Sequence, residues 1–139
     1  MKRITAVTLF AFASILGAGT ALAQHRAVQA TVPFDFTVGG KLLPSGTYTI
    51  AQVSSNIIEI RNQEKHAAVF SPTAADSNES RNGGKLVFNR YGGQYFLGEI
   101  LCESASMNVR LPATKWEKRA RVQEAQVHNG AGQTLVAAK

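Results

Sequence analysis

The sequence predicts a mainly β protein, an antiparallel β-sandwich or small barrel of about seven strands, with one C-terminal helix. In residues 30–50, ATVPFDFTVGGKLLPSGTYTI, two alternating runs flank a Gly-Gly pair and a Pro-Ser-Gly turn. Alternation with a period of two indicates strands with one buried face, and proline followed by glycine favours a tight turn. Further short alternating segments follow at spacings of about ten residues, which is typical of an antiparallel meander within a sandwich or small barrel.

The first strand is expected at residues 28–38, with alternate apolar side chains on its buried face. Pro33 lies on the other face and has no amide hydrogen to donate, so this strand is expected at a sheet edge or with a bulge there. Residues 71–84 form the longest polar stretch and are expected to be a loop. The remaining strands are expected at residues 47–53, 57–61, 66–70, 85–90, 95–102 and 107–111.

The clearest predicted hairpin is KLVFNR-YGGQ-YFLGEILC, residues 85–102, in which Gly92 and Gly93 supply the positive φ angles of the turn. Both faces of its second strand are partly apolar, so that strand is expected in the centre of a sheet. Strict alternation places four of its side chains on one face: Phe96, Gly98, Ile100 and Cys102.

A helix is expected within residues 113–128, because residues 115–127 contain neither glycine nor proline. Thr114, followed three residues later by Glu117, has the pattern of a capping box. The apolar stripe of this helix is thin, and Trp116 is the expected anchor against the β domain. Glycines follow the helix, and residues 129–139 are expected to be a disordered tail.

Residues 1–23 have the three parts of a secretory signal peptide. Lys2 and Arg3 form a positive segment, residues 4–18 an apolar run, and Ala21-Leu22-Ala23 a cleavage site. A spanning helix needs about 20 apolar residues, and glycines interrupt this run. We therefore expect an exported protein, periplasmic or extracellular, that does not span the membrane after cleavage and has its β domain at residues 24–112.

Cleavage would leave one domain with a modest positive charge. It would retain 13 of the 15 basic residues against 9 acidic ones. A domain of this size can fold without disulfides, and Cys102 has no second cysteine in the chain to pair with. Positive charge suits anionic surfaces. Nucleic acid is not an expected partner, because export separates the protein from cellular nucleic acid. In addition, the aromatic residues are not interleaved with basic ones.

Three segments, VPFDFTVG, LPSGTYTI and NRYGGQYFLGEI, are followed by a proline and a charged segment. In this pattern the chain resembles an uncharacterised family of small exported β-proteins that is abundant in acidobacteria and related soil bacteria. The resemblance covers residues 30 to about 121. It implies a bacterial, exported β domain, and it implies no reaction, cofactor or ligand, because the family has none assigned.

No pattern for catalysis or metal binding stands out, so no catalytic, cofactor-binding or metal residue is assigned and no cofactor is expected. The histidines, His25, His66 and His128, lack the spacing of a zinc site. Cys102 is expected to be a small buried hydrophobic residue. If its thiol were exposed instead, a disulfide could link two chains in a dimer. As a catalytic thiol it would need a lowered pKa and access, with His66 as its base.

The function favoured by these observations is a non-enzymatic binding or envelope-associated module, whose partner is an unknown protein or envelope component. Its candidate contact surface is the basic side of the helix: Lys115, Lys118, Arg119 and Arg121. Such a surface suits anionic lipid headgroups or a docked partner. The alternative is an extracytoplasmic hydrolase that uses Asp35 or His66.

A ligand cavity inside the β domain is a further alternative to a plain apolar core. Both would use the same aromatic residues: Phe34, Phe36, Tyr48, Phe88 and Phe96. The plain core is the favoured interpretation.

Overall fold

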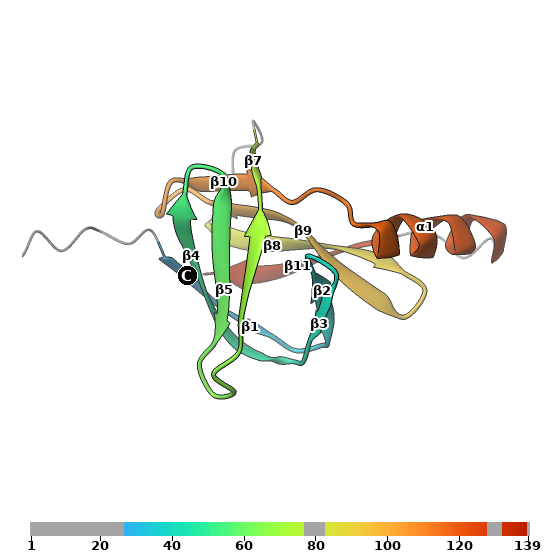
Figure 1. Ribbon diagram of the computed structural model, residues 1–139, viewed down its shortest axis with the longest axis horizontal. Coiled ribbons are helices and arrows are strands. Elements are labelled where there is room, and N and C mark those ends of the chain that lie inside the picture. The colour runs from blue at the N-terminus through green and yellow to red at the C-terminus, as the bar shows by residue number, and fades with distance from the viewer. Residues whose placement is uncertain (1–26, 77–82, 128–131, 139) are drawn as a thin grey trace, which may run out of the picture.

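The computed structural model describes residues 27–76, 83–127 and 132–138. Within these ranges the chain forms two sheets that curl into a half-barrel, together with one helix, α1 (Lys115–Val127), which extends away from the strands (Figure 1). The predicted fold class is confirmed. The predicted signal peptide, His25 and His128 lie outside the described ranges.

The first sheet has the strand order β1 (Ala27–Val32), β4 (Gly46–Ser54), β5 (Ile57–Asn62) and β6 (Ala68–Pro72). The second has the order β11 (Gly132–Ala138), β8 (Gly84–Tyr91), β9 (Gln94–Cys102), β10 (Met107–Arg110) and β7 (Ala74–Ala75). Two short strands join it, β2 (Phe36–Val38) and β3 (Lys41–Leu43): β2 pairs antiparallel with β3 and parallel with β9.

The chain passes from the first sheet to the second at Pro33. β1 ends at Val32, and β2 starts at Phe36. The predicted first strand is therefore two strands in different sheets, because proline cannot continue the hydrogen-bonded ladder. β1 pairs antiparallel with β4 and lies at the edge of its sheet, as expected for a strand that ends at proline.

Polar contacts fix the turn that returns the chain to β4. Asp35 Oδ1 accepts a hydrogen bond from the backbone amide of Ser45 at 2.7 Å. The buried Tyr48 hydroxyl donates to the carbonyl oxygen of Pro44 at 2.5 Å. The Asn62 side chain, also buried, accepts hydrogen bonds from the next turn's Glu64 and Lys65 amides. These contacts hold the ends of β4 and β5 in register.

Burial, the main cause, raises the pKa of the Tyr48 phenol above its ordinary value of 10.0; the hydrogen bond with Asn62 acts in the opposite direction, and the Asp35 carboxylate adds to the rise. The folded protein therefore holds the phenolic proton more tightly than the unfolded chain. Its contribution to stability is complete below pH 10 and is lost as the pH rises through the folded-state pKa.

Replacing Tyr48 by phenylalanine is expected to lower the free energy of unfolding by about 1 kcal/mol at pH 7, because the Pro44 carbonyl loses its donor. The gap between wild type and Y48F should narrow above pH 10, since only the wild type loses stability through this phenol. Urea unfolding of both proteins from pH 7 to 11 measures the gap. A gap that stays constant across this range would contradict the assignment.

β9 contains a bulge that the alternation pattern does not reveal. In its pairing with β8, Val87 lies opposite Glu99 and Phe88 lies opposite Leu97, so Gly98 is an extra residue. Because a bulge adds one residue, the side chains on its two sides no longer follow a single strict alternation between the faces of the sheet. The predicted shared face of β9 is therefore wrong for Phe96: Leu97 lies on the core face with Ile100 and Cys102.

The sequence explains why the bulge occurs at Gly98. A Cβ atom there would lie 2.9 Å from Nδ2 of Asn89, so only glycine leaves room for that side chain. The carbonyl oxygen of Gly98 accepts a hydrogen bond from the amide of Leu111 at 2.8 Å, beyond the end of β10. As a result Phe96 is directed toward the α1 side of the second sheet.

The aromatic residues between the sheets form a packed core. Phe88 contacts Phe34 and Phe36 edge to face, with ring centroids 5.1 and 5.3 Å apart. Phe36 also meets Tyr48 edge to face at 5.1 Å. Such arrangements are the favoured ones for aromatic pairs. These contacts support the plain-core interpretation for these four residues.

Residues Gly132–Ala138 form β11, so the prediction of a disordered tail is wrong for this segment. β11 pairs antiparallel with β8 along its whole length, from Gly132 opposite Arg90 to Ala138 opposite Gly84. Burial alternates along the strand, and β11 also contacts β1 of the first sheet. Because a Cβ atom at Gly84 would lie 2.5 Å from the Ala138 carbonyl oxygen, the absence of a side chain there permits this pairing.

Candidate functional site

The helix α1 begins at a cap that the sequence predicts. The Thr114 hydroxyl accepts a hydrogen bond from the Glu117 amide at 3.3 Å, and the Thr114 carbonyl accepts one from the Lys118 amide at 3.0 Å. The hydroxyl thereby satisfies one of the free amides of the first helical turn.

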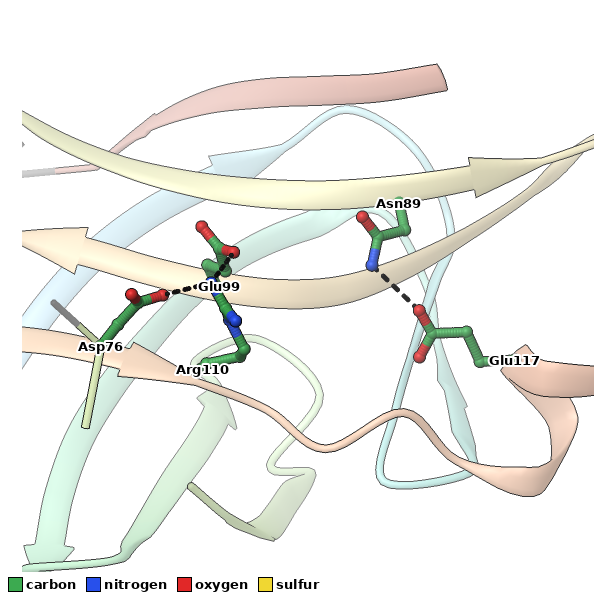
Figure 2. A network of polar contacts seen from close by, with 5 residues as sticks. All are labelled: Asp76, Asn89, Glu99, Arg110 and Glu117. Atoms are coloured by element: carbon green, nitrogen blue, oxygen red, sulfur yellow. Dashed lines mark hydrogen bonds and ion pairs between the residues drawn. The ribbon is translucent and has the colours of Figure 1, made fainter. Parts of the chain in front are cut away.

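The anchor of α1 is Glu117, whose exposed fraction is 7%. Its Oε1 accepts a hydrogen bond from Nδ2 of Asn89, on β8, at 2.9 Å (Figure 2). A buried carboxylate is costly unless a donor satisfies it, so this bond fixes where the helix meets the sheet. The capping threonine and the buried carboxylate together set the direction in which α1 leaves the β domain.

Trp116 is not the anchor, and that prediction is wrong. Its exposed fraction is 62%. Neighbouring helical residues point about 100° apart, so the burial of Glu117 turns Trp116 away from the sheet. The indole lies close to Gly40: a Cβ atom on that glycine would be 3.5 Å from Cδ1 of the ring.

An open groove of about 920 Å³ lies between α1 and the two hairpins beside it. Residues preceding and within β2 and β3 contribute to one part of its wall, the β8–β9 turn and the start of β9 to another, and α1 to the third. The lining residues are Asp35, Thr37, Gly40, Leu42, Gly93, Gln94, Tyr95, Phe96, Trp116, Lys118, Arg119, Ala120, Val122 and Gln123. The bulge at Gly98 is what brings Phe96 into this wall.

The groove presents apolar side chains that the core leaves uncovered. Leu42, Trp116 and Val122 are all exposed. Tyr95 stacks on Phe34 with ring centroids 4.0 Å apart, which fixes the tyrosine ring. Exposed apolar side chains gathered in a concave site are typical of an interaction site.

The four predicted contact residues are all exposed on α1, but they do not share one site. Lys118 and Arg119 line the groove. The Arg119 guanidinium carbon lies 5.6 Å from the centroid of the Trp116 ring, within range of a cation–π contact. Lys115 does not line the groove, and Arg121 lines a second hollow on another side of α1.

That second hollow, the polar cleft, has a volume of about 400 Å³ and lies on the Glu117 side of α1. In its wall Arg110 pairs with Asp76 at 3.2 Å and with Glu99 at 3.0 Å (Figure 2). Asp76 itself is buried and lies outside the set that lines the cleft. The charges are therefore largely matched among protein groups.

Tyr91 also lines the polar cleft. Burial raises the pKa of its phenol most; the Glu117 carboxylate adds to the rise, Arg121 opposes it, and Glu124 raises it further. The phenol is thus a neutral donor at physiological pH. Asn89 and Glu117, whose hydrogen bond holds α1 against β8, both line the polar cleft.

The remaining candidate residues are Asp35, His66 and Cys102. Among the described residues, no hydrogen bond joins any two of them. Asp35 lines the groove, but Oδ1 accepts the Ser45 amide. His66 is exposed in the turn after β5, with φ of 48°. Cys102 is 1% exposed, and its sulfur lies 3.2 Å from the Ser104 hydroxyl. Burial removes Cys102 from the surface where a cross-link between chains would form.

Among the described residues, no group of three or more His, Cys, Asp or Glu side chains is arranged to hold a metal ion. The same ranges contain no helix with the length and apolar character needed to cross a membrane.

Comparison with protein-family models, curated proteins and solved structures found no match to this chain. The chain is therefore characterised by its own structure, a two-sheet β domain whose C-terminal helix forms one wall of an open apolar groove.

Proposed function

We propose that the protein is a non-enzymatic binding module, exported to the periplasm or the extracellular space, and that it holds its ligand or envelope partner in the groove beside α1. The observation that carries this proposal is the groove itself, because its volume of about 920 Å³ lies within the range of ligand sites. The export part rests on the signal-peptide pattern of residues 1–23.

A hydrolase is the second candidate, because Asp35 lines this same groove. Its other named residue, His66, has no hydrogen bond to Asp35 among the described residues. The Asp35 carboxylate already accepts a backbone amide, which is the contact expected of a turn-closing residue. Binding without chemistry is therefore the better-supported function.

Trp116 makes the proposal testable, because it is the sole tryptophan of the chain and lines the groove. A ligand that covers the indole should shift its fluorescence to shorter wavelength. The exported protein, purified from its own envelope fraction, should also retain an adduct of defined mass in native mass spectrometry. Removing that adduct from the still-folded protein with a hydrophobic resin should move the fluorescence back to longer wavelength.

Two results would overturn the binding proposal. One is an adduct whose removal leaves the Trp116 fluorescence unchanged, which would place the ligand elsewhere. The other is catalytic conversion of the adduct by the wild type but not by D35N, which would assign the groove to the hydrolase.

A further inference from the structure

We propose that the ligand of the groove is an anionic amphiphile, a single apolar chain that ends in a carboxylate or a phosphate. This inference rests on the proposed function and adds the chemical class of the ligand. It follows from the way in which the groove combines apolar side chains with two cations that pair with no acidic side chain among the described residues.

The apolar chain has a matching surface. Leu42, Trp116 and Val122 are exposed on the two sides of the groove, and the half-buried Tyr95 adds aromatic surface between them. Covering such surface is favourable in proportion to the apolar area removed from water. A wholly polar ligand would leave these side chains in contact with water.

The groove continues along α1 as a smaller hollow of about 260 Å³. The two hollows share Gly93, Gln94, Ala120 and Gln123, and the smaller one reaches Val127. An elongated hollow of this kind suits a chain better than a compact ring system.

The anionic end has matching cations. Lys118 and Arg119 line the groove, and neither forms an ion pair with any described residue. The exposed Arg61 and Arg110, by contrast, each pair with carboxylates. The acidic side chains that line the groove and its extension are Asp35, which accepts the Ser45 amide, and Glu124.

Charge therefore selects among amphiphiles. A carboxylate or phosphate can pair with Lys118 and Arg119, whereas a cationic head would meet two like charges at that side of the groove. The positive balance of the cleaved chain, 13 basic residues against 9 acidic ones, favours the encounter with an anion as well.

The test is a titration of the exported protein with four C12 compounds below their micellar concentrations, followed through Trp116 fluorescence and calorimetry. Dodecanoate and dodecyl phosphate should bind at one per chain and shift the fluorescence to shorter wavelength. Dodecanol should bind about tenfold more weakly, because two exposed ion pairs contribute modestly. Dodecyltrimethylammonium should bind more weakly still.

Matched variants separate the groove from the general basic surface of α1. K118Q/R119Q should weaken dodecanoate binding about tenfold and leave dodecanol binding unchanged. K115Q/R121Q removes the same charge from residues that do not line the groove and should bind dodecanoate within about twofold of wild type. Circular dichroism checks that both variants fold.

The outcomes distinguish this inference from the proposed function. Equal binding of all four compounds, or equal loss in both double variants, would overturn the anionic specificity while leaving the groove as a binding site. If no compound shifted Trp116 but vesicles with anionic lipid bound the protein, a membrane surface would replace the soluble amphiphile. A fluorescence shift that depends on protein concentration alone would assign the groove to a second copy of the chain.

Discussion

Replacing Phe88 by alanine is expected to lower the free energy of unfolding by about 3–5 kcal/mol, the cost of removing a fully buried aromatic ring. Phe88 is 0% exposed and contacts both Phe34 and Phe36 edge to face. Phe34 in turn stacks on Tyr95 of the groove wall. The substitution should therefore loosen the groove as well as the core. Urea unfolding followed by circular dichroism measures the loss.

Phe70→Ala is the matched control for this change. Phe70 is on β6 and is 60% exposed, on the outer face of the first sheet. Its replacement should cost less than about 0.5 kcal/mol, as is usual for a surface substitution. Similar losses in the two variants would contradict the described core.

Replacing Glu117 by alanine is expected to lower the free energy of unfolding by about 1–3 kcal/mol, because the Asn89 amide loses its acceptor at a partly buried site. The larger consequence concerns binding. Without this contact α1 has no buried residue of its own against the sheet. The position of Trp116, and with it the wall of the groove, is then no longer fixed. The affinity of any groove ligand should fall about tenfold or more.

Two further variants isolate the contact. Glu117→Gln keeps an oxygen that can accept from Asn89, so it should cost less than about 1 kcal/mol and retain binding. Glu103→Ala removes an exposed carboxylate from the turn after β9 and should be neutral. If Glu117→Ala retained full affinity, the helix would be held in place by something other than this hydrogen bond.

The fold class could be predicted because alternation reports directly on a half-buried strand. This worked for the hairpin around Gly92 and for the edge position of the first strand, where local chemistry decides the outcome. The expected strand over residues 28–38 was nevertheless wrong as a single strand, because the chain changes sheets after Pro33. It failed at Gly98, since a bulge depends on the room that Asn89 needs, and that room is set by a neighbouring strand. Because of this extra residue, Phe96 lies in the groove wall and not on the predicted core face.

The candidate site was predicted in part. The charged side of α1 could be read from the sequence, but its division between two hollows could not, because it depends on which side of the helix faces the sheet. Hydrophobicity favoured Trp116 as the anchor, whereas a hydrogen bond between Glu117 and Asn89, 28 positions apart in the chain, decides the orientation. β11 was missed because its pairing with β8 is long-range and its composition is weakly apolar.

An amide NMR titration of the protein with dodecanoate shows most directly whether the groove is the binding site. The largest shifts are expected along the groove, at Gly40, Leu42, Phe96 and the Trp116 indole N–H. Residues on the outer face of the first sheet, which includes the exposed Ile57 and Phe70, should not move. Shifts that gather on that outer face, or that are absent from the groove at saturation, would contradict the account.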